Sequence, residues 1–274
     1  MKIDGHSISK EIIEHLKKLP KPEKIFAAIL VGDDPRSASF LKQKERVAKE
    51  LGVDFRLYNL RAELGNDGLR QEVRRLVGKN PVGGTVFQLP LPQGLNPHYV
   101  LNAIPRKKDV DVLTERALGA FYNGRNPVFP PAVATVKTIL EKVNFDLEKA
   151  EVAVVGLGNL VGKPVSVWLT RKCKNLFLLR RGSDLELLKR ADLIVTGVGQ
   201  TGLIKSDMLK SGAGVIDFGY YYSPDGEVSG DFSAEDVGKL SFYTPTPGGT
   251  GPILVAELFR NFYILNSQEK MTGQ

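Results

Sequence analysis

The chain has 274 residues, of which 42% are hydrophobic and 25% charged, a balance typical of folded globular proteins and not of disordered ones. At about 100–200 residues per domain, this length predicts two domains. The longest apolar runs fall well short of the ~18–20 residues that span a bilayer, and the first residues carry early acids and no apolar signal stretch. The single cysteine, Cys173, cannot form an internal disulfide, so we expect a cytoplasmic protein.

The charge balance favours anionic partners. Lysine and arginine total 38 against 31 acidic residues, which gives a net charge of +7. These basic residues are scattered and flanked by acids, so the pattern favours small anionic ligands over nucleic acid. The three histidines, His6, His15 and His98, have no metal-ligand spacing, and we therefore expect no metal site.

Strand-like and helix-like segments alternate along the chain, a pattern that predicts βαβ units and parallel sheets. Helices are expected at Ile8–Leu16, Ser37–Leu51, Leu69–Val77, from Asn96, at Ala134–Val143, Leu160–Arg171 and Ile253–Leu265. Strands are expected at Lys24–Val31, Val53–Leu57, Gly83–Leu89, Glu151–Val155, Asn175–Leu179, Asp192–Gly197 and Gly214–Phe218. The expected domains cover residues 1–132 and 133–251, with a last helix at 252–274 that packs back onto the first domain.

The segment from Val152 to Pro164 has the order of a dinucleotide-binding turn: a buried strand, glycines, then a helix. Gly156 allows the tight turn, and Gly158 lets a pyrophosphate approach the backbone at the helix N-terminus. The third glycine, Gly162, comes one position late for GxGxxG, so a plain glycine-rich turn is the alternative.

The strand that follows the glycine segment ends in Arg180 and Arg181, at a place where an NAD site usually carries an acid. Two guanidinium groups suit the additional 2′-phosphate of NADP through bidentate hydrogen bonds. The alternative is a solvated basic turn. Asp184 is interpreted as a helix cap and not as a ribose ligand.

Three shorter motifs permit both a structural and a chemical interpretation. Phe40 and Lys44 share one helix face, as the edge of a core or as a stacking ring beside an acid–base group. Gln88 stands at the end of a strand in a proline-stiffened turn that could present its amide to a ligand. Asp109 and Asp111 could form a turn and helix cap, or offer a carboxylate to paired N–H donors.

The segment from Thr244 to Pro252 is harder to explain as a simple connection, because it combines three prolines with three glycines. Such a composition fixes an extended loop and lets its backbone pass close to a ligand.

Taken together, the motifs FLKQK, FQLPLP, KDVD, GLGNLVGKP and TPTPGGTGP follow one another as in a known family. The chain resembles the bifunctional methylenetetrahydrofolate dehydrogenase/methenyltetrahydrofolate cyclohydrolase (FolD) family from Ile3–Gly5 to the last helix. The pair QLPLP and PGGxGP carries most of this resemblance.

The resemblance implies two Rossmann-like α/β domains with a cleft between them: a folate-binding catalytic domain at residues 1–132 and an NADP-binding Rossmann domain at 133–251. It also implies a homodimer. This enzyme would oxidise 5,10-methylenetetrahydrofolate with NADP and hydrolyse the methenyl product to 10-formyltetrahydrofolate, two reactions of the one-carbon metabolism that serves purine biosynthesis.

The resemblance also implies roles for individual residues. Lys44 would be the central catalytic lysine with Gln88 as its partner, and Asp111 would hold the N–H donors of the pterin. The remaining positions divide between substrate and cofactor. Substrate contacts would come from Phe40, Gly251 and Pro252, and cofactor contacts from Gly156, Leu157, Gly158, Arg180, Arg181 and Tyr220.

Several positions depart from the family pattern. Phe40 replaces a tyrosine, Ala132 a threonine and Val112 a glycine. Leu157 and Gly158 are less polar than the usual residues, and Leu254 replaces a threonine. The hydrolytic half of the activity depends on these departures more than the hydride transfer does.

Two other functions remain open at this point. One is an NADP-dependent dehydrogenase of another small carboxylate, such as a shikimate-type enzyme, which would have a lysine–aspartate pair without QLPLP and PGGxGP. The other is a basic nucleic-acid-binding protein, which would bind oligonucleotides in a salt-dependent manner.

Overall fold

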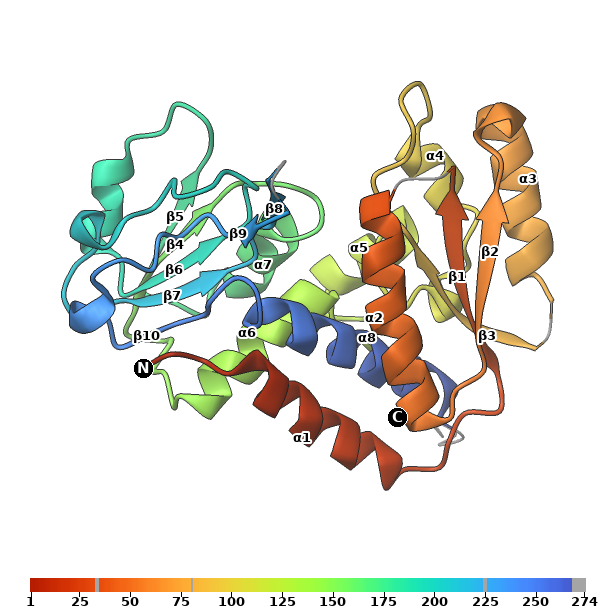
Figure 1. The fold of residues 1–274 in the computed structure, drawn as a ribbon, viewed down its shortest axis with the longest axis horizontal. Helices are drawn as coiled ribbons and strands as arrows, with labels where there is room; N and C mark the ends of the chain where they lie inside the picture. The colour runs from red at the N-terminus through yellow and green to blue at the C-terminus, as the bar shows by residue number, and fades with distance from the viewer. Residues whose placement is uncertain (33–34, 80, 224–225, 268–274) are drawn as a thin grey trace. The chain divides into compact units, whose positions relative to one another are not determined.

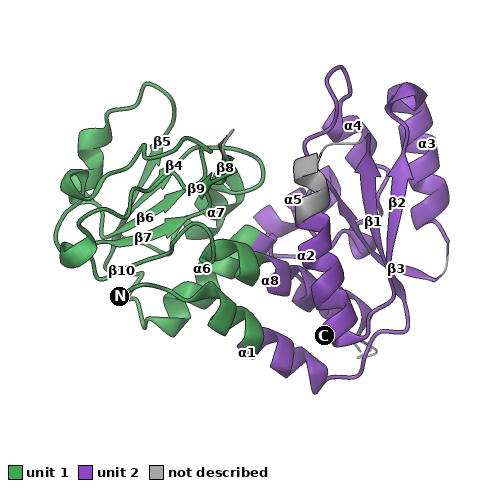
Figure 2. Cartoon of the chain, in the orientation of Figure 1, with its two compact units in different colours: residues 1–10, 132–254 green, residues 11–131, 255–274 purple. Residues whose placement is uncertain are grey.

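Two separate parallel sheets organise the chain in the computed structural model, which describes residues 1–32, 35–79, 81–223 and 226–267 (Figure 1). Each sheet is the centre of one unit (Figure 2). Unit 1 comprises residues 1–10 and 132–254, and unit 2 comprises residues 11–131 and 255–274.

Unit 2 is built on three parallel strands in the order β2-β1-β3, namely β1 (Ile25–Val31), β2 (Phe55–Leu60) and β3 (Val82–Phe87). The connections are α2 (Pro35–Leu51) and α3 (Gly65–Val77). Every residue of β1 is buried, as expected for a central strand with helices on both faces. The shorter helices α4 (Pro97–Leu101) and α5 (Glu115–Tyr122) follow β3.

The core of unit 2 has two parts. Leu69, Val73 and Leu76 lie three or four residues apart on α3 and pack with Val100 and Leu101 of α4. Elsewhere in this unit the ring of Phe26 stacks on that of Phe262, with centroids 4.8 Å apart, and meets Phe259 edge-on. Both of these phenylalanines belong to α8 (Thr250–Asn266).

Unit 1 contains a five-stranded parallel sheet in the order β10-β7-β6-β4-β5. Its strands are β4 (Glu151–Val155), β5 (Asn175–Leu179), β6 (Leu193–Thr196), β7 (Gly214–Asp217) and β10 (Phe242–Tyr243). Helices α6 (Pro131–Lys142) and α7 (Gly162–Leu169) belong to this unit, as does a hairpin of β8 (Tyr221–Tyr222) and β9 (Val228–Ser229). Short 3₁₀ turns occur in both units. Unit 2 contains η1 (Ala62–Leu64) and η2 (Arg106–Lys108), and unit 1 contains η3 (Leu185–Arg190), η4 (Ser206–Met208) and η5 (Val237–Lys239).

The N-terminus extends the edge of the sheet in unit 1. The amide of Ile3 donates to the carbonyl of Tyr243, and the amide of Tyr243 donates to the carbonyl of Met1. Helix α1 (Gly5–Lys17) then carries the chain from unit 1 into unit 2, and α8 does the same near the C-terminus.

The expected α/β class with parallel sheets is confirmed, and the main helices and strands lie where the hydrophobic pattern predicts them. Most boundaries differ by one to four residues, and helix α5 was not expected. Two of the differences have a clear local cause. The strand predicted from Val53 starts at Phe55, because the amide of Val53 still donates to Ala48 at the end of α2. The helix predicted at Leu160–Arg171 is shorter: it begins at Gly162 and ends at Leu169, because Thr170 has left the helical conformation and Arg171 has a φ of 67°. Strands β8, β9 and β10 have two residues each, too few for a periodic signal.

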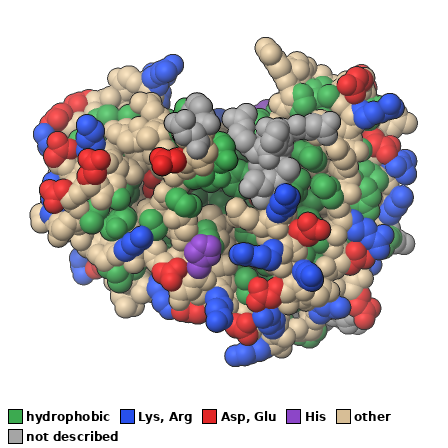
Figure 3. Space-filling view, in the orientation of Figure 1, with side chains coloured by type: hydrophobic (Ala, Val, Ile, Leu, Met, Phe, Trp, Pro, Cys, Tyr) green, Lys and Arg blue, Asp and Glu red, His purple; other side chains and the backbone are tan. Residues whose placement is uncertain are grey.

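On the face shown in Figure 3, basic and acidic side chains are interspersed and form no continuous basic stripe. Within the described residues, no helix is both long and apolar enough to cross a membrane.

Candidate active site and cofactor edge

The first part of the candidate site lies on α2 in unit 2. Phe40 and Lys44 are one helical turn apart, and Phe40 is half-buried. Lys44 is only 8% exposed, which is unusual for a lysine and excludes the interpretation of a snorkelling amine at a core edge.

Gln88 lies at the carboxyl end of β3, where parallel sheets usually place their ligands. Its backbone amide donates to the carbonyl of Ile29, and its side-chain Nε2 donates to the carbonyl of Leu89 at 3.1 Å. Its Oε1 then accepts a hydrogen bond from Lys44 Nζ at 3.0 Å. The side chain of Gln88, at the end of β3, therefore fixes the position of the buried Lys44 amine.

The segment from Asp109 to Asp111 runs beside β3, because Asp109 forms a parallel bridge with Thr85. The two aspartates have different surroundings. The Asp109 carboxylate accepts from the amides of Leu113 and Thr114, at 3.0 and 2.8 Å for Oδ2, and so closes the turn before α5. Asp109 is therefore the turn-forming cap, and Asp111 lies close enough to Lys44 for their charges to interact.

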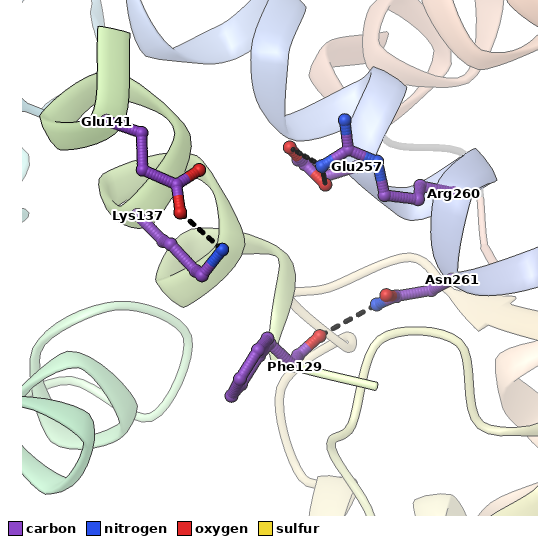
Figure 4. Close-up of polar contacts among 6 residues, drawn as sticks. All are labelled: Phe129, Lys137, Glu141, Glu257, Arg260 and Asn261. Atoms are coloured by element: carbon purple, nitrogen blue, oxygen red, sulfur yellow. Dashed lines mark hydrogen bonds and ion pairs between the residues drawn. The ribbon is translucent and has the colours of Figure 1, made fainter. Parts of the chain in front are cut away.

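This segment is also held from α8. Asn261, 3% exposed, donates from Nδ2 to the carbonyl of Val110 at 2.9 Å and to that of Phe129 at 2.7 Å (Figure 4). One side chain therefore fixes the backbone directly before Asp111. On the same helix, Glu257 is paired with Arg260 at 2.8 Å, and in unit 1 Lys137 pairs with Glu141 along α6 (Figure 4).

Burial changes the acid–base properties of Lys44 and Asp111. It raises the pKa of Asp111 to about 6, although the positive charge of Lys44 acts in the opposite direction. It also lowers the pKa of Lys44, against the effect of the negative charge of Asp111. An amine whose pKa has been lowered by burial can take up or release a proton more readily than an exposed lysine.

Val112 occupies the position where the family pattern has a glycine, and its backbone keeps the conformation that glycine allows. Its φ is +56°, in the left-handed region, and its side chain is fully buried. For a β-branched residue this conformation is strained. The turn between Asp111 and α5 therefore has a left-handed residue that is not a glycine.

A separate candidate site, for a cofactor, is the carboxyl edge of the sheet in unit 1. Gly156 follows β4 with a φ of +85°, and its amide donates to the carbonyl of Leu179 at the end of β5. Gly162 begins α7 so close to this turn that a Cβ would lie 1.7 Å from the carbonyl oxygen of Gly156. A Cβ on Gly158 would meet no atom within 4 Å, so its backbone is open to a ligand. The late third glycine therefore still provides close packing between helix and strand.

Arg180 and Arg181 come next to the glycine turn because β5 pairs with β4, with Leu179 beside Val155. Both arginines are exposed, and neither guanidinium has an ion pair or hydrogen bond within the described part of the chain. Asp184 is a cap, as predicted: its Oδ1 accepts from the amide of Glu186 at the start of η3. An open backbone turn beside two guanidinium groups fits a phosphorylated dinucleotide.

The remaining predicted residues are also in unit 1. Leu157 lies inside the glycine turn, and Tyr220, 38% exposed, follows β7. Gly251 and Pro252 are in the first turn of α8. The structure thus brings Lys44, Gln88 and Asp111 together in unit 2, and it groups the glycine turn with the arginines in unit 1.

Two family models match the chain. The model of the tetrahydrofolate dehydrogenase/cyclohydrolase catalytic domain matches residues 3–111, and that of the corresponding NAD(P)-binding domain matches residues 130–270. The chain is 34% identical over 262 residues to the bifunctional protein FolD of Clostridium perfringens, and the match covers 94% of each chain.

Solved structures show the same likeness. The bifunctional FolD enzyme of Campylobacter jejuni superposes with a TM-score of 0.90 at 31% identity, over 96% of each chain. The Trypanosoma brucei N5,N10-methylenetetrahydrofolate dehydrogenase-cyclohydrolase, solved with NADP cofactor and an inhibitor, gives 0.89 at 26% identity, over 97% of this chain and 96% of that one. A shikimate 5-dehydrogenase from Thermus thermophilus shares only the fold, with a TM-score of 0.52 at 14% identity.

Proposed function

The chain belongs to the tetrahydrofolate dehydrogenase/cyclohydrolase family, and from this premise we propose how its residues divide the work. The enzyme oxidises 5,10-methylenetetrahydrofolate with NADP and hydrolyses the methenyl product to 10-formyltetrahydrofolate. Unit 2 binds the folate, and unit 1 binds the cofactor. The observation that carries this assignment is the buried Lys44 amine, hydrogen-bonded to Gln88 at 3.0 Å and facing Asp111.

Lys44 is the acid–base group for the hydrolytic step. The methenyl product is a cation that water attacks, and an amine whose pKa is lowered by burial can orient that water and accept its proton. The Gln88 amide fixes the direction of the amine through its Oε1. Both residues therefore count as catalytic in this proposal.

Asp111 recognises the substrate. The pterin presents adjacent N–H donors, and an ionised carboxylate accepts both of them. Its pKa of about 6 leaves it ionised at neutral pH and ready to accept. Phe40 offers a ring for stacking from one turn earlier on α2, and Gly251 and Pro252 add backbone contacts to the substrate.

NADP, when bound, accepts the hydride from the folate bridge. In unit 1 the glycine turn at Gly156, Leu157 and Gly158 receives the pyrophosphate, with the amides at the start of α7 as donors. Arg180 and Arg181 would bind the 2′-phosphate, and Tyr220 would contribute to holding the nicotinamide half.

The test is a single absorbance experiment on the purified protein. Mixed with NADP and 5,10-methylenetetrahydrofolate, it should give the NADPH band with a transient methenyl band. Added alone to the methenyl compound, it should remove the methenyl band. Formation of NADPH from shikimate instead of the folate would support the alternative dehydrogenase.

The setting of the reaction is also part of the proposal. The enzyme acts as a homodimer in the cytoplasm, and its 10-formyl product serves purine biosynthesis. Its partners are small molecules and neither nucleic acid nor membrane, which the interspersed charges in Figure 3 support. Light scattering for the dimer and salt-dependent oligonucleotide binding for the excluded partner test these statements.

A further inference from the structure

Two buried carboxylates lie at the carboxyl edge of the sheet in unit 1, outside the residues assigned so far. Asp217 ends β7 and is 1% exposed, and Asp231 follows β9 and is fully inaccessible. Aspartate is almost never fully buried unless its charge is compensated, so the contacts of this pair need an explanation.

The Asp231 carboxylate accepts four hydrogen bonds from a single short segment. The donors are Thr196 Oγ1 at 2.7 Å and the amides of Val198, Gly199 and Gln200 at 2.6, 2.7 and 2.8 Å. Because an ionised carboxylate has about four acceptor sites, this set uses all of them. The turn that follows β6 is therefore shaped by one side chain that is more than thirty residues away in sequence.

That turn packs directly against the predicted pyrophosphate turn. A Cβ on Gly156 would lie 2.8 Å from Val198 Cγ2 and 3.1 Å from the carbonyl oxygen of Gly197. A shift of even a few tenths of an ångström in residues 197–200 would therefore be passed on to Gly156. Val198 itself is 44% exposed, an apolar side chain held at the open edge of the sheet.

Asp217 connects the same region to the next strand. Its carboxylate accepts from the amides of Gly219 at 2.6 Å and Phe232 at 2.9 Å, so it fixes both the residue before Tyr220 and the residue after Asp231. Its own carbonyl accepts from Thr250 Oγ1 at 2.8 Å at the start of α8. Burial, together with the charge of Asp231, raises the pKa of Asp217 to about 7.

The strand order indicates which end of the cofactor this network would meet. β4 lies between β5 and β6, and the arginines proposed for the 2′-phosphate follow β5. A dinucleotide whose pyrophosphate lies at β4 must then extend its other half toward β6 and β7. Asp231 and Asp217 shape the backbone at the ends of those two strands.

We propose that Asp231 is a positioning residue for the nicotinamide half of NADP: it aims the 197–200 turn, and through it the glycine turn, without touching the cofactor. This inference rests on the proposed function, because it presumes that unit 1 binds NADP. An apolar residue of similar volume at this place would leave all four donors without an acceptor, so the carboxylate is what holds the turn in its shape.

The main test is Asp231→Asn. The amide has one acceptor oxygen, and its NH₂ group would oppose backbone donors, so the turn loses its shape. We expect the Kd for NADPH, measured by fluorescence titration, to rise by about 10- to 100-fold, with kcat/KM for the dehydrogenase falling at least as far. Hydrolysis of the methenyl compound without cofactor should stay within about threefold, because it depends on unit 2.

A matched control is Asp192→Asn. Asp192 directly precedes β6, whereas the turn held by Asp231 follows the other end of that strand. Asp192 accepts from the amide of Glu151 at 2.8 Å and pairs with Lys210, so it is also a carboxylate that organises backbone. Its replacement should lower thermal stability and leave the Kd for NADPH unchanged. An equal loss of NADPH affinity in both variants would overturn the inference, since it would mean a general effect on the unit.

A gentler pair of variants decides the matter if Asp231→Asn does not fold. Thr196→Val removes one of the four hydrogen bonds at constant size, and Thr196→Ser keeps it. We expect Thr196→Val to raise the Kd for NADPH by about 3- to 10-fold and Thr196→Ser to match the wild type. Wild-type affinity in Thr196→Val, or in a folded Asp231→Asn, overturns the inference. Failure of the wild-type protein to bind NADPH would instead contradict the proposed function itself.

Discussion

Lys44 is the acid–base group of the proposed hydrolytic step, and Lys44→Met removes its amine at nearly constant length. A positioned acid–base group typically contributes about 10²–10⁴-fold, so we expect hydrolysis to fall by that factor and hydride transfer to weaken less. Folate binding should survive because Asp111 and Phe40 remain. Steady-state rates of both reactions, with a folate Kd, provide the measurement. Hydrolysis at the wild-type rate in this variant would remove Lys44 from the mechanism.

Asp111 predicts a pH dependence of folate binding. Its pKa of about 6 means that acidification from pH 7 to 5 protonates the carboxylate and takes away an acceptor for the pterin donors. We expect the folate Kd to rise by roughly tenfold per pH unit below about 6. In Asp111→Asn the Kd should be high and independent of pH over this range. A wild-type Kd that stays constant from pH 7 to 5 would contradict this role.

The same titration affects stability with the opposite sign. Because burial raises the folded-state pKa of Asp111 from 3.8 to about 6, its contribution to stability is fully present below pH 3.8 and is lost as the pH rises through about 6. Mild acid therefore weakens binding through this group without weakening the fold. Unfolding curves at pH 7 and 5 separate the two effects.

Val112 predicts a reversal of the usual order of alanine and glycine. Within helices and strands alanine is more stable than glycine by about 0.5–1 kcal/mol. At a φ of +56°, however, alanine keeps the left-handed strain of about 1–2 kcal/mol that glycine relieves. We therefore expect Val112→Gly to be more stable than Val112→Ala by about 1 kcal/mol in denaturant unfolding.

Val47 offers the control for this comparison, because it is also buried but lies within the regular helix α2. At this position Val47→Ala should be more stable than Val47→Gly, by about 1 kcal/mol. The same order at both positions would mean that the backbone of Val112 is not strained in solution.

At the scale of elements, the turn between β4 and α7 contains two glycines with different roles. Gly162 is needed for packing, and Gly158 is proposed to be needed for binding. Gly162→Ala would place a Cβ 1.7 Å from the carbonyl oxygen of Gly156, so the helix and the turn must move apart. Gly158→Ala has open space around the new methyl group. We expect the first variant to lose more than about 3 kcal/mol of stability, and the second to keep its stability but bind NADPH about 10-fold more weakly.

Thermal unfolding and an NADPH titration on the same two variants provide the measurements. If Gly158→Ala keeps full NADPH affinity, the pyrophosphate does not approach the backbone at that residue. If Gly162→Ala is as stable as the wild type, the turn and helix are packed less tightly than the structure indicates.

At the scale of the whole molecule, what could be predicted depends on how far apart in sequence the interacting residues lie. The helices, strands and glycine turn have signals within windows of about 15 residues, and they were placed correctly to within a few positions. The contacts of Asp231 join residues 31–35 positions apart, and those of Asn261 span 132 and 151 positions. No local pattern marks either residue, and the conformation of Val112 contradicts the preference of its own side chain.

The proximity of Lys44, Gln88 and Asp111 shows the same division. Each residue is in a motif that the sequence marks, yet burial of the amine depends on β3 running beside both β1 and the Asp109 segment. The motifs therefore marked the three residues, whereas the parallel pairing of distant segments determines how they lie relative to one another and which way their pKa values shift.

The continuity of two helices leads to a prediction for the unfolding of the complete chain. Helices α1 and α8 each run from one unit into the other, so loss of either unit removes part of a helix from its neighbour. We expect one cooperative thermal transition. A ligand at 100 times its Kd adds about 2.7 kcal/mol, so saturating NADPH should raise the Tm by roughly 5–10 °C.

The comparison with NADH makes this experiment specific. NADH lacks the 2′-phosphate that Arg180 and Arg181 are proposed to bind, and a charge-assisted hydrogen bond is worth about 1.5–3 kcal/mol. At equal concentration NADH should therefore raise the Tm much less than NADPH does, and the double variant Arg180→Ala/Arg181→Ala should respond equally weakly to both. Calorimetry measures all four cases. Equal shifts for NADPH and NADH in the wild-type protein would mean that the two arginines form only a solvated turn after β5.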